Sequence, residues 1–304
     1  MNRTVLISRI QVRIPYSHPW THLRLNTLTD RLKSWPLYVL PHHLLSRIVF
    51  KLTRIEGRLV PTIIKIFVRL FNVELDEATH ASPNSYKSFN EFFTRTLKDD
   101  ARPLHTGDLV CPVDGRVSQL GPIESGTIVQ AKNHSYQLAE LLGGRIEDCT
   151  PFVNGRFATL YLSPRDYHRI HMPVTGKLCS MHYIPGRLFS VAPHTVRVVP
   201  RLFARNERVV ALFDTSAGKM AMVLVGAINV AAIETVWEGL ITPPAKSEII
   251  YKDYDSDFLT LEKGAEMGRF NMGSTVIVLL ERGSLHSDFN PGDPVRMGQL
   301  FGHL

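Results

Sequence analysis

Hydrophobic positions in the first hundred residues recur with the period of an α-helix. Between Leu40 and Asn72 an apolar stripe repeats at helical spacing, with a basic stripe beside it at i, i+4, i+7 and i+11. The apolar stripe is Ile48, Leu52, Ile55 and Leu59, and the basic stripe is Arg47, Lys51, Arg54 and Arg58. Gly57 and Pro61 then interrupt the pattern, which favours two helices over one.

The second helix of this region is also amphipathic. Its polar side carries Lys65 and Arg69, and its apolar side carries Ile63, Ile64, Phe67, Leu70 and Phe71. Further on, Ser88-Phe89-Asn90-Glu91 has the pattern of a capping box and predicts a short helix that runs to about Leu97.

After Pro103 the pattern changes to short runs of β-branched and apolar residues separated by Gly and Pro. The runs that we expect to form strands are 158–162, 177–184, 209–214, 220–236 and 275–280. The predicted fold class is therefore α+β, with N-terminal amphipathic helices followed by a mainly β body. We divide the chain into a basic lead-in (1–36), a helical region (37–100) and a mainly β domain (101–304).

The basic charge is concentrated at the N-terminus. The chain has a net charge of +7, but residues 1–72 contain twelve Lys or Arg and only two acidic residues, whereas the remainder contains 23 basic and 26 acidic residues. Such asymmetry indicates a segment that meets an anionic surface, either a membrane or a nucleic acid. The pattern alone leaves open whether the two helices pack on the core or lie in a membrane interface.

Three features narrow the class of protein. Cys111, Cys149 and Cys179 are too few and too widely spaced for a disulfide framework or a zinc site, so no metal is expected. No apolar run reaches the ~18 residues needed to span a bilayer. Arginines break up the first residues, which argues against a signal peptide, although an Arg-rich, acid-poor start is also typical of an organelle transit peptide.

Three polar clusters among the β-type runs could carry chemistry. They contain Asp114, the pair His168 and His171, and Ser274. Each alone is commonly structural, since Asp-Gly and Gly-Ser pairs are frequent in turns. Together they suggest a triad, because a histidine oriented by an aspartate can remove the proton of a serine hydroxyl. Gly273 allows a strained backbone before Ser274, so the target of the serine could be its own chain.

Several long runs, in order, resemble the bacterial, membrane-associated phosphatidylserine decarboxylases. The resemblance begins at Leu40-Pro41-His42-His43 and extends to near the C-terminus. The matching runs include Ser88 to Phe93, Pro112 to Gly115, Leu162 to Pro173, Pro185 to Val191, Leu202 to Arg208, Val225 to Ala227, Ile233 to Trp237, Gly268 to Phe270 and Gly273 to Val276. One departure is Met272, where the family usually has Leu, and the similar volumes of these residues predict that self-cleavage survives.

The resemblance implies an enzyme that makes its own cofactor. Autocatalytic serinolysis would cut the chain between Gly273 and Ser274, and Ser274 would become a covalent pyruvoyl group. That group would form a Schiff base with phosphatidylserine and allow its decarboxylation to phosphatidylethanolamine, a step of phospholipid biosynthesis. Asp114 and His171 would activate Ser274, His168 would assist the decarboxylation, and Ser190 is a weaker candidate for orienting the substrate.

The same resemblance implies where the protein works. Its partners would be phosphatidylserine in an anionic membrane and its own large and small chains after cleavage, with a homodimer as an open alternative and no nucleic acid. A two-chain lipid stays in the bilayer, so the expected location is peripheral, on the cytoplasmic side of the cell membrane, or alternatively at the mitochondrial inner membrane. The helices of 37–100 are then a physically suitable membrane-docking region.

Two other classes of function use part of the same evidence. A Ser-His-Asp hydrolase of lipid or peptide esters needs the same three residue types, but Ser274 lacks the Gly-x-Ser-x-Gly elbow. A noncatalytic membrane or nucleic-acid adaptor would use the basic segment and leave the three polar clusters unexplained.

Overall fold

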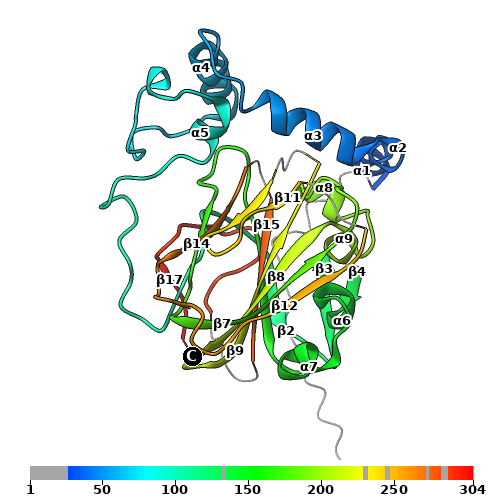
Figure 1. Cartoon of the computed structure of the whole chain (residues 1–304). Helices are drawn as coiled ribbons and strands as arrows, with labels where there is room; N and C mark the ends of the chain where they lie inside the picture. The colour runs from blue at the N-terminus through cyan, green and yellow to red at the C-terminus, as the bar shows by residue number, and fades with distance from the viewer. Residues whose placement is uncertain are drawn as a thin grey trace, which may run out of the picture.

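A β body with helices along one side makes up the molecule, which we describe from a computed structural model. The structure describes residues 27–131, 134–228, 232–243, 247–271, 274–281 and 287–303. Helices α1 to α4 run along the upper side of the body in Figure 1, and the chain between α4 and the body passes down its left side. The predicted α+β class, with helices before a mainly β body, is confirmed.

The helices are short, and most precede the body in the chain. They are α1 Thr27–Ser34, α2 Pro36–Val39, α3 His42–Leu52, α4 Val60–Phe71, α5 Phe89–Phe93, α6 Leu138–Leu142, α7 Ile146–Cys149, α8 Pro193–Val196 and α9 Leu202–Arg205, with 3-10 turns at Pro83–Ser85 and Thr150–Phe152. Most of the basic lead-in lies outside the described residues.

Helix α3 ends earlier than the basic stripe requires. Thr53 closes it, since its hydroxyl donates to the carbonyls of Val49 and Phe50. Arg54 folds back on this end, donating to Phe50 O at 3.2 Å with its guanidinium 3.6 Å from the centre of the Phe50 ring. The prediction of one helix face that carries Arg47, Lys51, Arg54 and Arg58 was therefore wrong, because only its first two members are helical.

Helix α4 has two adjacent apolar faces instead of one. Val60 and Ile64 are buried, and with Phe67 they pack on a small cluster that includes Phe92 and Phe93 of α5. The other face, which begins at the N-cap residue Leu59, is exposed, with residues that are 50% to 74% accessible: Leu59, Ile63, Ile66 and Leu70. The predicted single face thus combined residues that the structure separates. Two series of apolar residues have the helical spacing of 4, 3 and 4 residues, one starting at Leu59 and one at Val60, and the pattern alone does not distinguish them.

The predicted N-cap at Ser88 is present at α5, but the return bond of the capping box goes to Lys87 N instead of Ser88 N. The Ser88 hydroxyl accepts from Glu91 N at 3.2 Å, and the Glu91 carboxylate accepts from Lys87 N at 2.7 Å. The helix stops at Phe93, short of the expected Leu97, because Leu97 pairs instead with Ala78 in an isolated β-bridge.

A nine-stranded sheet forms the centre of the body, in the order β12-β7-β8-β9-β15-β5-β2-β16 with β13 beside β7. A second sheet has the order β11-β10-β14-β6, and two pairs, β1-β17 and β3-β4, complete the described strands. The bounds are β1 Leu109–Val110, β2 Gly115–Pro122, β3 Thr127–Ala131, β4 His134–Gln137, β5 Arg156–Tyr161, β6 Arg169–His171, β7 Gly176–Ile184, β8 Arg208–Thr215, β9 Gly218–Val225, β10 Ile233–Thr235, β11 Gly239–Thr242, β12 Ile250–Asp253, β13 Thr260–Leu261, β14 Glu266–Phe270, β15 Thr275–Leu280, β16 Pro294–Val295 and β17 Leu300–Gly302.

Strand β15 lies in the middle of the large sheet. It pairs antiparallel with β9 on one side and with β5 on the other, and all six of its residues are buried. An apolar run without alternation is what burial on both faces predicts. The expected strand 220–236 is wrong in its length, because it divides into β9 in this sheet and β10 in the smaller one.

Candidate active site

Asp114 and Ser274 lie at the same end of the large sheet, because each directly precedes a strand that pairs with β5. Asp114 precedes β2 and Ser274 precedes β15. At the end of β5, Leu162 N donates to Ser274 O at 2.9 Å. A Cβ on Gly115 would lie only 2.3 Å from Tyr161 O, so the glycine after Asp114 permits this close approach.

Strand β6 brings His171 to this end as well. His171 N donates to Pro112 O at 2.9 Å, which holds β6 beside the segment that carries Asp114. On its other edge, β6 pairs with β14, the strand that leads toward Ser274. The topology therefore gathers segments that lie 57 to 160 residues apart in the sequence, although the described hydrogen bonds do not join Asp114, His171 and Ser274 to one another.

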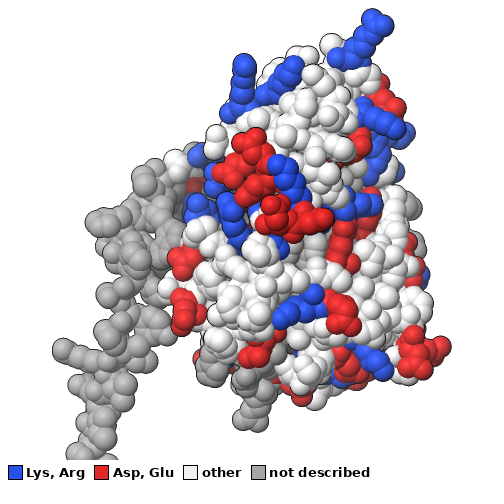
Figure 2. Space-filling model, turned by 90° about the vertical axis from the view of Figure 1, so that its left-hand side faces the viewer, with Lys and Arg blue, Asp and Glu red and all other residues white. Residues whose placement is uncertain are grey.

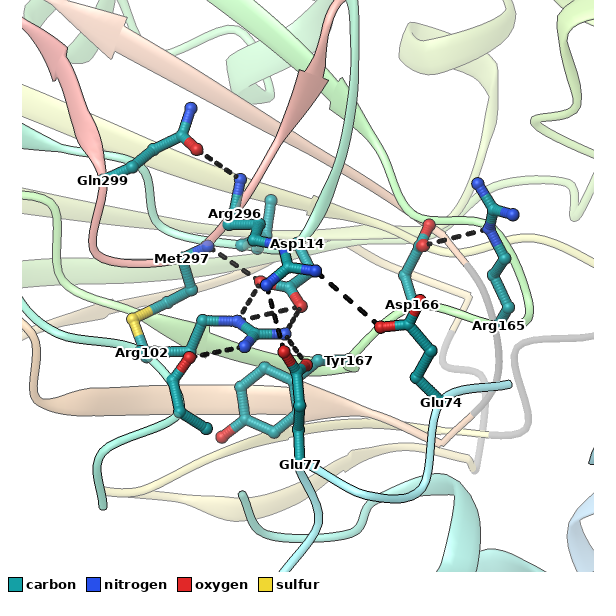
Figure 3. A network of polar contacts seen from close by, with 12 residues as sticks. Glu74, Glu77, Arg102, Asp114, Arg165, Asp166, Tyr167, Arg296, Met297 and Gln299 are labelled. Atoms are coloured by element: carbon teal, nitrogen blue, oxygen red, sulfur yellow. Dashed lines mark hydrogen bonds and ion pairs between the residues drawn. The ribbon is translucent and has the colours of Figure 1, made fainter. Parts of the chain in front are cut away.

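The Asp114 carboxylate is held by Arg102 and by the backbone near the C-terminus (Figure 3). Arg102 Nε donates to Oδ1 at 3.0 Å, Arg102 Nη2 donates to Oδ2 at 2.5 Å, and Met297 N donates to Oδ1 at 2.8 Å. The Arg102 and Asp114 side chains are only 7% and 11% exposed. Burial lowers the pKa of Arg102, but the carboxylates of Asp114 and Glu77 outweigh it and raise the pKa above its ordinary value.

The contact between Arg102 and Asp114 belongs to a larger ionic network. Arg102 also donates to Glu77 at 2.7 Å, and Arg296 pairs with Glu77 at 3.0 Å and with Glu74 at 3.7 Å. These residues line a pocket of about 220 Å³, and Figure 2 shows acidic and basic side chains gathered on this flank of the molecule. The network thus ties the segment after α4 to the body and to residues beyond Ser274.

His171 is oriented by two other groups. Its Nδ1 lies 2.8 Å from Gly264 O and its Nε2 lies 3.1 Å from the Tyr167 hydroxyl. A carbonyl can only accept, so we assign the proton to Nδ1, which leaves the lone pair on Nε2 to accept from Tyr167. Burial lowers the pKa of His171. The ring is therefore neutral near pH 7, as a general base must be.

His168 is buried in a different environment. Its ring stacks on Phe93, with centroids 4.2 Å apart and an interplanar angle of 20°. Neither ring nitrogen has a hydrogen-bond partner among the described residues. Burial, and then the charge of Arg95, lower its pKa to about 3. The carbonyls of Pro164 and Ser163 oppose this shift without reaching a nitrogen in hydrogen-bond geometry.

Ser274 is fully buried, and its hydroxyl has no hydrogen-bond partner among the described residues. Gly273 and Met272 lie outside the described residues, so the expected cleavage bond itself is not described.

Ser190 lies elsewhere, in a half-buried loop, where its hydroxyl accepts from Ala192 N at 3.3 Å. The neighbouring Arg187 and Leu188 bind Tyr38 O and the His42 ring of the N-terminal helices.

Sequence reasoning missed the groups that hold the predicted residues. Tyr167 lies in the run from Leu162 to Pro173, four residues before His171, but nothing in the sequence indicates that its hydroxyl is the partner of His171 Nε2. Arg102, Met297 and Gly264 carry no sequence signal, because they reach the site only through tertiary structure. The roles of Asp114, His171, His168, Ser274 and Ser190 stay predictions.

Replacing Arg102 with methionine should destabilise the uncut protein by about 3 kcal/mol, since removing one partner leaves the other as an uncompensated buried charge. Urea unfolding of the Ser274→Ala chain with and without the change would measure the loss in free energy. Arg116→Met is the control, because Arg116 is exposed and makes one described side-chain bond, to Gly292 O. Equal losses for both variants would contradict the importance of the network.

Comparisons with known proteins show the family of the chain. The family model described as phosphatidylserine decarboxylase matches residues 89–303, and a second model, described as PSD, matches residues 32–72. The first match covers well over half of the chain and includes Asp114, both histidines and Ser274. The chain therefore belongs to the phosphatidylserine decarboxylase family, and the predicted class of enzyme, a carboxy-lyase, is confirmed.

Relatives from several bacteria carry the name phosphatidylserine decarboxylase proenzyme. The protein of Shewanella denitrificans is 53% identical over 284 residues, which covers 90% of this chain and 98% of the relative. That of Psychromonas ingrahamii is 53% identical over 279 residues, with 90% and 98% covered. That of Alkalilimnicola ehrlichii is 57% identical over 254 residues, with 82% and 88% covered.

Proposed function

We propose that this protein converts phosphatidylserine to phosphatidylethanolamine with a pyruvoyl group that it makes from Ser274. The observation that carries the proposal is the buried, unpartnered hydroxyl of Ser274 at the head of a central strand, in a chain whose relatives are named proenzymes. A buried hydroxyl without a hydrogen bond is costly, and Ser274 combines this feature with its position directly after Gly273 in the sequence.

The proposed maturation begins with proton removal by His171. The Tyr167 hydroxyl would first release Nε2, which then takes the Ser274 hydroxyl proton, and Ser274 Oγ attacks the Gly273 carbonyl carbon. The peptide C–N bond breaks as the C–O bond forms, so an ester replaces the amide and the nitrogen regains a proton. Loss of the Ser274 α-proton then expels the Gly273 carboxylate and leaves dehydroalanine. Water replaces the nitrogen, ammonia leaves, and a ketone remains at position 274.

The described surroundings fit a small ketone at this position. The site is enclosed, and Ser274 O stays bound to Leu162 N, which would hold the new chain end in place. When present, a pyruvoyl group supplies a carbonyl that condenses with a primary amine and accepts electrons from its α-carbon. Asp114 would favour the protonated form of His171, since its charge raises the pKa of that ring.

His168 is the proposed proton donor to the substrate carbon after carbon dioxide leaves. Its ring nitrogens are free among the described residues, and Phe93 holds the plane of the ring. The carboxylate of phosphatidylserine beside the ring would raise its pKa and counter the effect of burial. Ser190 remains a weaker proposal for orienting the substrate, because its described contact is with its own loop.

No helix in the described parts of the chain is long and apolar enough to cross a bilayer. Helices α1 to α4, which we call the helical layer, nevertheless expose many large apolar side chains. Besides the exposed face of α4, Leu28, Leu32, Trp35 and Val39 are each at least 64% accessible. Arg47 and Lys51 in α3 and Arg58 just before α4 are exposed as well. An apolar surface with basic residues around it suits the interface of an anionic membrane.

We therefore propose that this layer docks the protein peripherally on the cytoplasmic leaflet, where anionic lipid is found. Arg54 is not part of this dock, because it turns toward the body and pairs with Glu234 at 3.7 Å. A substrate that stays in the bilayer and an apolar surface exposed on one side of the body both favour docking on a membrane. The homodimer stays a prediction.

Changing the exposed face of α4, namely Leu59, Ile63, Ile66 and Leu70, to glutamine should abolish most vesicle binding at every salt concentration. Changing Arg47, Lys51 and Arg58 to glutamine should weaken binding roughly a hundredfold at low salt, at ~1 kcal/mol per charge, and hardly at all at high salt. Flotation with phosphatidylserine vesicles across a salt series measures both effects.

A pair of single substitutions provides the matched control. Leu70 in α4 and Ile146 in α7 are 73% and 79% exposed, and Figure 1 places their helices at opposite ends of the molecule. Leu70→Gln should weaken vesicle binding and Ile146→Gln should not. Equal effects would show that docking does not use the helical layer.

A further inference from the structure

Glu234 joins three side chains that come from different parts of the chain. It lies in β10, and its carboxylate accepts from Asn271 Nδ2 at 2.9 Å and from Arg269 Nε at 2.7 Å. Arg54, from the loop after α3, approaches it at 3.7 Å. The Glu234 side chain is 18% exposed, so these contacts are partly shielded from water.

Asn271 is the last described residue before Ser274 in this part of the chain, so its position limits where the chain can go. Its N–H donates to Ala232 O at 3.0 Å, and the residue is fully buried. On the other flank, Ser274 O accepts from Leu162 N at 2.9 Å. Only two residues separate these two anchors in the sequence, so a displacement of Asn271 acts close to Ser274.

Glu234 supplies the main side-chain contact of Asn271. Asn271 Nδ2 faces two acceptors, Glu234 Oε1 and, more distantly at 3.5 Å, Ala232 O. Because both neighbours can only accept, the amide nitrogen is assigned to this side of the Asn271 side chain. Oδ1 is buried and has no hydrogen-bond partner among the described residues. Without the Glu234 carboxylate, the amide would lose its strongest contact and could rotate.

Two cations hold the carboxylate in this position. Arg269 pairs with it across the β10-β14 ladder, in which Glu234 and Arg269 are register partners. Arg54 is itself held by Phe50 O and the Phe50 ring, so it gives the carboxylate a support that does not depend on the β10-β14 pair.

We propose that Glu234 is a positioning residue for self-cleavage, which holds Asn271 and thereby the chain that enters the bond before Ser274. This inference rests on the proposed self-cleavage. Geometry of the attacked bond controls the rate strongly, since small displacements of reacting groups are costly.

Cell-free synthesis of the full chain, followed by a time course on denaturing gels, measures the rate of cleavage. Glu234→Ala should cleave roughly tenfold to a hundredfold more slowly than wild type. Glu234→Gln keeps an oxygen that can accept from Asn271, so it should recover part of the rate. Asn271→Ala should be slow as well, and the double variant no slower than the worse single one, because both changes remove the same contact.

Glu238→Ala is the matched control. Glu238 lies in the turn that joins β10 to β11, and it binds Lys252 at 2.5 Å and Tyr254 at 2.8 Å, with no described contact to Asn271. We expect wild-type cleavage for it. Equal slowing of Glu238→Ala and Glu234→Ala would mean that the hairpin is merely weakened, and would overturn the inference.

The Ser274→Ala chain separates failure of this inference from failure of the proposed function. If Ser274→Ala stays whole while Glu234→Ala cleaves at the wild-type rate, the positioning role is wrong and self-cleavage stands. If Ser274→Ala is cut at the same place as wild type, the proposed maturation itself is wrong, and Glu234 loses its assigned role with it.

Discussion

Ser274→Ala should remain a single chain of 304 residues, whereas the wild-type protein should divide into residues 1–273 and 274–304. No hydroxyl would then remain to attack the Gly273 carbonyl, so we expect complete loss of cleavage and of decarboxylation. In the wild type, the small chain should be lighter than its serine-headed form by one ammonia. Intact-mass spectrometry measures all three masses.

Thr275→Val is the control for this result. Thr275 is the next residue, and its hydroxyl is also buried without a described partner. Because the Thr275 hydroxyl is not the proposed nucleophile, the Thr275→Val chain should still be cut. A wild-type chain that stays whole and reacts with a hydroxyl-directed fluorophosphonate would instead support the Ser-His-Asp hydrolase. The noncatalytic adaptor already disagrees with membership of an enzyme family.

His171→Ala should slow self-cleavage by at least about a hundredfold, the usual contribution of general-base catalysis. Asp114→Asn should also leave most of the chain whole, because the negative charge that favours protonated His171 is lost. Time courses of freshly synthesised chains measure both rates. Normal cleavage in His171→Ala would remove this residue from the maturation scheme.

His168→Ala should show the opposite behaviour. Its chain should be cut, but carbon dioxide release from phosphatidylserine vesicles should fall by about a hundredfold, because no group would then protonate the substrate carbon. If His168→Ala blocks cleavage and His171→Ala does not, the two roles are exchanged.

The pH dependence of cleavage gives an independent check on His171. The base must be neutral, and burial lowers its pKa below the ordinary value of about 6.5. Cleavage should therefore be insensitive to pH near neutrality and should slow only as the pH falls through this lowered pKa. A rate that declines between about pH 7.5 and 6.5 would contradict a buried, neutral base.

Local patterns predicted the elements well where neighbouring residues decide the structure. The runs 177–184, 209–214 and 275–280 became β7, β8 and β15 with ends within about two residues, and Ser88 began α5 as its capping pattern indicates. The helix prediction failed at Arg54, which turns back onto Phe50 and meets Glu234 across 180 residues of sequence. A stripe of helical spacing cannot reveal such a partner.

By itself, the sequence determined the class of fold, the family and the residues proposed for the chemistry, because helical periods, turn residues and long motifs are all written along the chain. Only the tertiary structure decided which groups surround them. Asp114 binds Arg102 and Met297, His171 binds Gly264 and Tyr167, and Glu234 binds Asn271. These contacts depend on how β2, β6, β10 and β15 are arranged in their sheets, and strand order is set by packing of the whole core rather than by any local pattern.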